Sequence, residues 1–347
     1  MNNIPFFSVV VPVYNSERTV GKMIESMQQQ TFSNFELILV NDGSTDTTEQ
    51  VLESYAVEDN HISYFTILNG GPGNARNKGI ERTKGEYLLL FDADDEISSD
   101  TLETYAELLI NNSADLIVSS YKMKIIDNNE VVGSRIISAP NENYKNQEDF
   151  LKAIYPLMNE QLMYVVWNKV FKLDIIKKYA VLFPPYKSCE DRLFNLKYYK
   201  HVENCITTDK ILYQYSFDGK NSLTNKFLFN KYDTFVEFYQ ELLSLTNKNQ
   251  EGSSALFLKG VMSCIMPVHS KECPFDFNEK LAYIKGIVQS SEVQSAASIS
   301  LTDTKIRLVM KWLFKSKSVT INYFASMAIY LISTTSPRVI EKLKRNF

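Results

Sequence analysis

The stretch Tyr87-Leu-Leu-Leu-Phe-Asp-Ala-Asp-Asp95 decides the fold class of this chain. Its five apolar residues indicate a buried strand, and three carboxylates follow within the next four positions. Carboxylates this crowded resist ionising unless a cation lies between them, and oxygen ligands suit a hard ion such as Mg²⁺ or Mn²⁺. From these residues alone two interpretations stay open: a cation site that also holds substrate phosphates, or a polar turn between a strand and a helix.

Short apolar runs alternate with amphipathic stretches around this segment, which predicts an α/β fold with a largely parallel sheet. The predicted strands are residues 8–13, 35–40, 61–67 and 87–91. The first predicted helix carries four apolar residues on one face: Val20, Met23, Ile24 and Met27. Asp46 and Glu49 predict a capping box at the start of the next helix. A turn at 70–74, a short helix at 75–82 and a longer helix at 100–111 complete this pattern.

Further along the chain the pattern changes from strands to helices. Residues 115–120 and 123–126 are strand-like, with Asn128-Asn129 as the predicted hairpin turn. From about Asn221 the helical patterns lengthen, beginning at 231–245, and residues 247–254 are the predicted linker. The sequence therefore predicts an α/β domain over residues 1–220 and a helical C-terminal region over residues 221–347.

Two of the predicted strands end in acidic loops. Asp42 follows the second strand and Asp92 follows the fourth. In open α/β sheets ligands collect at the carboxyl ends of the strands, so both carboxylates are expected at one edge of the sheet. The two loops are predicted to hold a nucleotide, with its base and ribose at one end and its metal-bound diphosphate at the other.

Composition excludes several other classes of protein. With 44% hydrophobic and 22% charged residues the chain is an ordinary globular protein, and a net charge of −4 argues against general nucleic-acid binding. Its four cysteines and three histidines show no metal-ligand spacing. The first residues show no secretory signal, so we expect a protein of the reducing cytoplasm.

The C-terminal region is basic, whereas the rest of the chain is acidic. Residues 305–347 carry a charge of +8 and the remainder −12. The apolar run 319–332, which lies between two basic segments, is too short and polar to span a membrane. Two interpretations stay open: an amphipathic helix on the anionic inner face of the cell membrane, or a helix packed on the domain with its lysines solvated.

Four segments together resemble family 2 glycosyltransferases in their order and spacing. They are Ser8-Val-Val-Val-Pro-Val-Tyr-Asn15, Val40-Asn-Asp-Gly-Ser-Thr-Asp46, Gly73-Asn-Ala-Arg-Asn-Lys-Gly79 and Phe91-Asp-Ala-Asp-Asp95. Each segment alone is a weak signal, while the ordered set is specific, and the resemblance covers residues 6–225. It implies a GT-A fold, which is a Rossmann-like, mostly parallel sheet flanked by helices. It also implies a nucleotide-sugar donor, usually a UDP-sugar, a divalent Mn²⁺ or Mg²⁺, and inversion at the anomeric carbon.

The resemblance assigns donor-binding roles to individual positions. Asp42 stands where the family hydrogen-bonds the nucleobase, although Asn41 replaces the acid that precedes it in the family. Pro12 and Tyr14 stand where the family lines the uridine, and for Tyr14 a packed aromatic at a strand end is an equal alternative. Arg76 resembles the basic residue near the nucleotide, with an ion pair to surface acids as the alternative.

The acidic segment would hold the metal and the ribose. The resemblance implies that Asp94 binds the metal directly and that Asp92 approaches the ribose or a metal-bound water. Asp95 would not bind the metal itself but would help to orient it, or it would contact the acceptor or a phosphate.

Two later segments, Val166-Trp-Asn-Lys-Val170 and Cys189-Glu-Asp-Arg-Leu-Phe194, resemble those of capsule- and cell-wall-type members. There the second acid of the Glu-Asp pair is the catalytic base, which points to Asp191, with Glu190 as a supporting neighbour. Acids also suit the start of a helix electrostatically, and that is the structural alternative. Trp167 would stack on a sugar or serve as a buried aromatic anchor, and Lys169 would contact the acceptor or the donor phosphate.

The resemblance thus implies an inverting, metal-dependent transfer of one sugar to a hydroxyl of a glycan acceptor. Neither of the two tryptophans follows an arginine, so the Gln-X-X-Arg-Trp element of processive members is absent from the sequence. The acceptor would be a glycan on a polyprenyl diphosphate lipid or a glycoprotein, in the assembly of surface polysaccharide or glycoconjugates.

Three alternatives remain from other classes of protein. A dinucleotide-dependent oxidoreductase is disfavoured because Arg76 stands where a Rossmann fingerprint needs its third glycine. A sugar nucleotidyltransferase would share the metal and the sheet but needs a basic glycine-rich loop, which residues 12–18 lack. A non-catalytic sugar-nucleotide-binding module differs from the enzyme only in that it does not cleave the donor.

Overall fold

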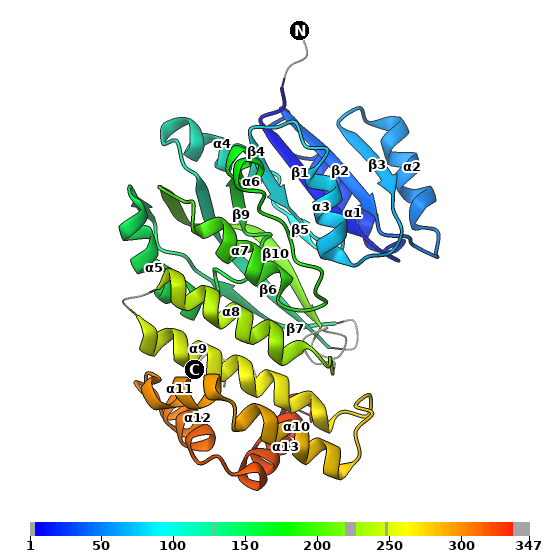
Figure 1. Ribbon diagram of the computed structural model, residues 1–347. Helices are drawn as coiled ribbons and strands as arrows, with labels where there is room; N and C mark the ends of the chain where they lie inside the picture. The colour runs from blue at the N-terminus through cyan, green and yellow to red at the C-terminus, as the bar shows by residue number, and fades with distance from the viewer. Residues whose placement is uncertain (1–3, 128–129, 219–226, 247–248, 336–347) are drawn as a thin grey trace. The chain divides into compact units, whose positions relative to one another are not determined.

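The computed structural model describes residues 4–127, 130–218, 227–246 and 249–335 (Figure 1). The chain divides into two compact units, Met1–Phe217 and Asp218–Phe347. The boundary predicted from the sequence, after residue 220, lies next to this division.

The sheet of the first unit begins with four parallel strands. They are β1 (Phe7–Val13), β2 (Phe35–Asn41), β3 (Ile62–Thr66) and β4 (Tyr87–Leu90), in the order β3-β2-β1-β4 (Figure 1). Every residue of β4 is buried, as its continuous apolar run predicts. Because β1 lies between β2 and β4, the loops that follow β2 and β4 leave the same edge of the sheet.

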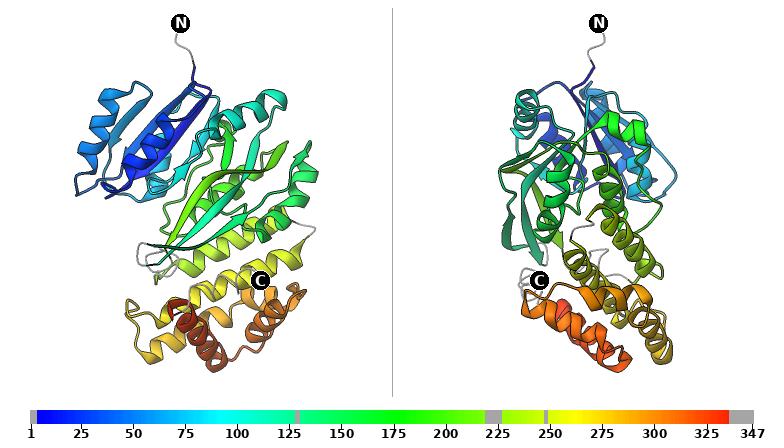
Figure 2. Two further views of the ribbon diagram at one scale, coloured as in Figure 1. Left: turned by 180° about the vertical axis from the view of Figure 1, so that it is seen from behind. Right: turned by 60° about the vertical axis from the view of Figure 1, so that its left-hand side comes forward.

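Beyond β4 the sheet contains antiparallel pairs, among them β4 with β9 (Lys169–Lys172) and β9 with β6 (Leu116–Asp127). After β4 the order continues β9, β6, β10 (Cys205–Asp218) and β5 (Glu96–Ile97). Strand β7 (Glu130–Ile137) pairs with β6, and β8 (Glu142–Tyr144) pairs with β10. Figure 2 shows the long green strands from behind.

The predicted α/β class is therefore confirmed, but the sheet is mixed rather than mostly parallel. The two strand-like runs at 115–120 and 123–126 are one strand, β6, with an irregularity between Ile125 and Ile126. An apolar pattern reports burial and not strand direction, which is why the antiparallel half was missed. The predicted turn at Asn128-Asn129 lies outside the described residues.

Seven helices accompany the described strands of this unit. They are α1 (Val20–Gln28), α2 (Thr48–Glu58), α3 (Pro72–Ile80), α4 (Thr101–Asn111), α5 (Gln147–Asn159), α6 (Leu173–Tyr179) and α7 (Glu190–Tyr199). The buried face of α1 consists of the four predicted residues, Val20, Met23, Ile24 and Met27.

The predicted capping box of α2 is wrong. The cap position is Thr47, and its side chain makes no capping hydrogen bond. Asp46 instead accepts the Thr48 N–H at 3.0 Å, two residues on, and Glu49 accepts the Thr66 hydroxyl at 2.6 Å. Short polar side chains choose such local turns as readily as a cap, so the spacing alone did not settle the geometry.

The described part of the second unit contains only helices, coloured from yellow-green to red in Figure 1. They are α8 (Lys231–Leu245), α9 (Gln250–Ile265), the 3₁₀ turn η2 (Met266–His269), α10 (Phe277–Val288), α11 (Ser291–Ile299), α12 (Lys305–Lys315) and α13 (Val319–Thr335). Helix α9 packs against α8, α11 and α12 and is buried along most of its length. Within the described residues, no helix combines the length and apolar character needed to cross a bilayer.

The predicted linker at 247–254 is wrong over its described part. Helix α9 begins at Gln250, and the Asn249 side chain caps it by accepting the Gly252 N–H at 3.1 Å. Ser253 and Ser254 are fully buried, and the Ser254 hydroxyl lies 2.8 Å from the Tyr239 hydroxyl. These small polar residues allow close helix packing, which composition does not distinguish from a loop.

Candidate active site

Helix α3 is held close against the sheet by glycines. A Cβ on Gly79 would lie 2.3 Å from a Val10 methyl of β1 and 3.2 Å from a Val40 methyl of β2, so only glycine fits without displacement. At the other end of the helix Gly73 faces Phe183 and Glu190, whose nearest atoms would lie 3.2 Å and 3.5 Å from an added Cβ. The two glycines place α3 between the parallel strands and the segment that leads into α7.

Arg76, in the middle of α3, joins two of the predicted carboxylates. One guanidinium nitrogen donates to Asp92 at 2.6 Å, and the other terminal nitrogen donates to Asp191 at 2.9 Å. Arg76 is buried, whereas Asp92 and Asp191 keep 27% and 23% of their side chains exposed. The end of β4 and the start of α7 are therefore coupled through a single buried cation.

The surroundings of Arg76 shift the proton affinities of the site. Burial raises the pKa of Asp191 to about 7, against the opposing effect of Arg76, while Glu190 raises it further. Burial disfavours the charged form of Arg76, but Asp191 and then Asp92 outweigh it and raise the pKa of the guanidinium. Arg76 therefore stays charged, and Asp191 is a partly exposed carboxyl that exchanges its proton near neutral pH.

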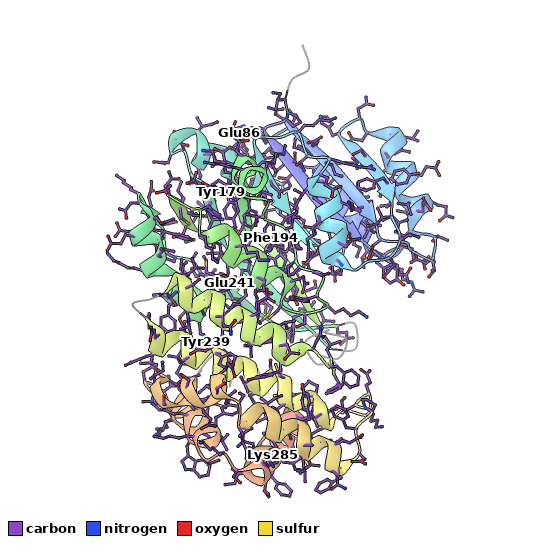
Figure 3. The ribbon with its side chains drawn as sticks, viewed as in Figure 1. Glu86, Tyr179, Phe194, Tyr239, Glu241 and Lys285 are labelled. Carbon is purple, nitrogen blue, oxygen red and sulfur yellow. The ribbon has the colours of Figure 1, made fainter. Side chains whose placement is uncertain are left out.

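The segment that leads into α7 is fixed on α3 by a pair of amide hydrogen bonds. The Asn77 side chain donates to the Phe183 carbonyl and accepts the Phe183 N–H, both at 2.9 Å. The Phe183 ring stacks on Phe194 of α7 with centroids 4.1 Å apart, and Figure 3 labels Phe194. Cys189, the residue before α7, has a φ of 69°, an uncommon left-handed conformation for a residue with a side chain. These contacts fix Glu190 and Asp191 in the first helical turn.

Asp42, which directly follows β2, fixes the N-terminal end of α3. Its two carboxylate oxygens accept the N–H groups of Gly70 and Gly71, each at 2.8 Å, and the side chain is 3% exposed. The Asn69 side chain donates to the Asp42 carbonyl at 2.9 Å. Because α3 begins at Pro72, Asp42 fixes its N-terminus while Arg76 reaches Asp92 and Asp191. The predicted convergence of the strand-end carboxylates is therefore present along one helix.

The acidic segment after β4 divides into an exposed and a buried part. Asp94 is exposed, and partial desolvation of its carboxyl group, followed by the nearby charge of Asp92, raises its pKa. Asp95 is buried and accepts the Ser216 N–H from β10 at 3.0 Å, while its second oxygen has no hydrogen-bond partner. Burial, Asp92 and Asp94 raise the pKa of Asp95 well above its usual range.

Residues 8–179 match the family described as Glycosyl transferase family 2. The chain belongs to this family. It is therefore a glycosyltransferase, and the matched residues contain β1 to β4, α3 and the acidic segment.

The similar proteins carry related names. The uncharacterized glycosyltransferase EpsJ of Bacillus subtilis (strain 168) is 29% identical over 250 residues, which cover 68% of this chain and 70% of EpsJ. The poly(ribitol-phosphate) beta-N-acetylglucosaminyltransferase TarS of Staphylococcus aureus (strain MW2) is 31% identical over 213 residues, 60% of this chain and 35% of TarS. The crystal structure of S. aureus TarS 1–349 in complex with UDP-GlcNAc has a TM-score of 0.66 at 23% identity, and the match covers 94% of this chain and 91% of that one. The last comparison bears on the fold alone.

The acidic segment of this glycosyltransferase can hold a divalent ion only if the donor supplies the ion's remaining ligands. In the part of the chain that the structure describes, no group of three or more His, Cys, Asp or Glu is arranged to hold a metal. A Mg²⁺ or Mn²⁺ ion that binds through one or two carboxylates and substrate phosphates does not need such a group. The raised pKa of Asp94 and the unpartnered oxygen of Asp95 mark a local excess of negative charge. Asp92 and Asp94 therefore suit an ion whose remaining ligands come from the donor.

Two residues that were predicted to contact the acceptor, Trp167 and Lys169, are buried. Trp167 is 3% exposed and stacks on Tyr213 and Tyr215, with centroids 4.5 Å and 5.2 Å apart. This is the geometry of the buried anchor, the alternative to sugar stacking. Lys169 is fully buried and donates to the Leu162 carbonyl at 2.7 Å, the Val165 carbonyl at 2.6 Å and the Asn168 side chain at 2.7 Å.

Lys169 nevertheless contributes charge to the site. Burial lowers the pKa of its ammonium to about 7, and Asp191 opposes this shift. All three N–H groups are directed at protein oxygens, so its contacts hold the segment 162–169 and leave no N–H for a substrate phosphate.

The two residues predicted to line the uridine lie at the end of β1. Tyr14 is half exposed, and Pro12 lies between buried Val11 and Val13.

Sequence reasoning missed Tyr213 and Asn77. The Tyr213 hydroxyl accepts the Asp92 N–H at 3.1 Å, and its ring stacks on Trp167, so it supports the acidic segment from β10. The strand pattern of β10 was not recognised, and its pairing partners could not be read from spacing. Asn77 was inside the quoted segment Gly73–Gly79, but its contact with Phe183 joins positions more than a hundred residues apart.

Proposed function

We propose that the chain is an inverting, metal-dependent, non-processive glycosyltransferase that moves one sugar from a UDP-sugar to a hydroxyl of a surface glycan. The observation that carries the proposal is Arg76, which joins Asp92 of the donor side to Asp191 of the acceptor side. A single reaction needs both carboxylates at one place, and this ion-pair network supplies that arrangement.

The donor would bind along the N-terminal end of α3. Asp42 is held by the N–H groups of Gly70 and Gly71, yet each carboxylate oxygen can accept more than one hydrogen bond. An uracil N–H is a suitable donor to it, and the half-exposed Tyr14 ring, at the end of the adjacent strand, offers a face for the base. Arg76 lies farther along the helix toward the diphosphate.

Asp191 would act as the general base that accepts the proton of the attacking hydroxyl. A base works best when its pKa lies near the working pH, and that of Asp191 is about 7. Its exposed fraction leaves the carboxylate accessible, while Arg76 holds one oxygen in a fixed direction. Glu190, one residue earlier in the same helical turn, raises the pKa of Asp191 and so increases its strength as a base.

Asp92 and Asp94 would hold the divalent ion together with the donor diphosphate. When bound, a Mg²⁺ or Mn²⁺ ion neutralises charge on the departing nucleoside diphosphate. Asp95 would keep the segment in place through the Ser216 N–H. Tyr213 would support Asp92 from the backbone side.

The class of acceptor is suggested by the relatives. Proteins named poly(ribitol-phosphate) beta-N-acetylglucosaminyltransferase and poly(ribitol-phosphate) beta-glucosyltransferase are 31% and 30% identical to this chain over 213 and 198 residues. We propose an acceptor of the same broad class, a glycan or polyol-phosphate polymer of the cell surface. A glycan on a polyprenyl diphosphate lipid or on a glycoprotein is compatible with the same residues.

The proposal is tested by offering a panel of nucleotide sugars with Mn²⁺ and measuring nucleoside-diphosphate release, with and without acceptor. We expect slow release from one UDP-sugar alone and faster release with a suitable glycan, with inverted anomeric configuration in the product. Release of pyrophosphate from a nucleoside triphosphate and sugar phosphate would instead identify a nucleotidyltransferase. Donor binding with no release under any condition would identify a binding module.

A further inference from the structure

The outer side of α12 exposes large apolar side chains. Leu308, Val309 and Trp312 are 57%, 53% and 59% exposed, and their spacing places them on one side of the helix. Exposed Lys305 lies one turn before them and exposed Lys315 one turn after. We call these five residues the α12 face.

The opposite side of α12 holds the helix in its unit. Met310, Leu313 and Phe314 are buried, and α12 packs against α9 and α11. Arg307 is also buried and binds Asp303 through two hydrogen bonds of 2.8 Å and 3.0 Å. The fold of the unit therefore does not depend on the α12 face, and an exposed Trp and two aliphatic residues at its centre call for another explanation.

The charge around the α12 face has one sign. Residues 305–335, which include α12 and α13, contain five Lys/Arg and no Asp or Glu. Lys317, in the turn between the two helices, is exposed. Asp303, just before α12, forms an ion pair with Arg307. Helix α13 adds further exposed apolar residues, Ile321 and Phe324 among them.

We propose that the α12 face binds an anionic lipid bilayer, with its apolar side chains in the headgroup boundary and its lysines at the lipid phosphates. Trp is favoured at this depth because its ring is apolar and its N–H is polar, and lysines extend their ammonium groups from an apolar stem to the charged surface. An 11-residue helix lying flat gives a contact about 16 Å long. Charge complementarity distinguishes this occupant from a neutral membrane or an apolar protein groove.

The two tryptophans make the proposal directly measurable in the full-length chain. Trp167 is buried in the first unit, so a change in tryptophan emission on adding vesicles reports Trp312. We expect a blue shift and co-sedimentation with vesicles of mixed phosphatidylcholine and phosphatidylglycerol, and neither with phosphatidylcholine alone. Rising salt should weaken the binding, because the lysine contribution is screened.

Variants separate this surface from the rest of the chain. Replacing Lys305, Lys315 and Lys317 by Gln should weaken vesicle binding by about fivefold for each lysine. Leu308→Ser with Trp312→Ser should abolish co-sedimentation, while Val57→Ser, at an even more exposed apolar residue on α2, should leave it unchanged. Because all of these side chains are exposed, nucleoside-diphosphate release in solution should be unaffected, so the test does not depend on the proposed reaction.

Three results would overturn the proposal. The first is no binding to anionic vesicles at low salt, and the second is binding that the α12 variants leave unchanged. The third is a blue-shifted Trp312 and a larger sedimenting species without any lipid, which would make the α12 face a contact between copies of this chain.

Discussion

Replacing Arg76 by Gln removes the cation that connects Asp92 and Asp191 in the candidate active site. The positive charge opposes the burial that raises the pKa of Asp191 to about 7, so its loss must raise that pKa further. The bonded atoms are 2.9 Å apart, and for charge centres about 4 Å apart at an effective dielectric constant of about 20 the interaction is about 4 kcal/mol. Asp191 is 23% exposed, and solvent screening reduces this energy, so we expect the pKa to rise by about one to two units.

The direction of the pH effect follows from the proposed role of Asp191 as the general base. A general base works in its ionised form, so activity is lost as the pH falls through the pKa of Asp191. The acidic limb of kcat/KM in Arg76→Gln should therefore move to higher pH by about one to two units. At pH 7 the ionised fraction of Asp191, and with it the activity, should fall by about 5- to 50-fold, with a smaller deficit at pH 9. The assay is nucleoside-diphosphate release across this pH range.

Controls separate this effect from misfolding. Removing one partner of a buried ion pair costs about 3–5 kcal/mol, so thermal unfolding of the variant must be measured as well. Arg76→Lys keeps the positive charge but lacks the planar guanidinium that donates to both carboxylates. It should show a smaller shift of the acidic limb. Arg82→Gln, which removes an exposed arginine just after α3, should leave the profile in place. An Arg76→Gln enzyme with an unmoved acidic limb and only a raised KM would refute the reasoning and restrict Arg76 to donor binding.

Three further predictions concern the metal, a buried lysine and a glycine. Asp94→Asn should weaken donor binding in the presence of Mn²⁺ but not in its absence, as measured by calorimetry; equal losses in both would exclude a metal role. Lys169→Met should lower the free energy of unfolding by about 3 kcal/mol in urea titrations, because it removes three hydrogen bonds worth about 1 kcal/mol each; an unchanged midpoint would contradict this. Gly79→Ala should cost about 1–3 kcal/mol, because its Cβ would lie 2.3 Å from Val10, whereas Gly286→Ala in the last turn of α10, where a Cβ meets no atom within 4 Å, should stabilise by about 0.5–1 kcal/mol. Equal effects of the two alanines would show that the contact with Val10 does not set the cost.

The parallel half of the fold was predictable because its signals are local. The apolar runs of β1, β2 and β4 are continuous, and the α1 pattern repeats with helical spacing. The antiparallel half was not predictable, because β6, β9 and β10 are ordered by contacts between distant segments. Local spacing also failed at Gln250, where small polar residues begin a buried helix instead of a linker.

The candidate site was predictable as a set of residue types but not as a network. The sequence placed Asp42 and Asp92 at strand ends, and the structure connects both to α3. That Arg76 bridges Asp92 and Asp191 depends on α7 packing beside α3, a contact over more than a hundred residues. Trp167 shows the opposite limit, because a tryptophan in a motif looks the same in sequence whether it faces a sugar or the core.

The most direct test of the shared active site compares donor binding with turnover in Asp191→Asn, with Glu190→Gln as the matched control from the same helical turn. The account predicts that Asp191→Asn binds the donor with a dissociation constant within about twofold of the wild type and loses at least about 100-fold in turnover, while Glu190→Gln keeps most of its activity. Turnover of Asp191→Asn close to that of the wild type would contradict the account.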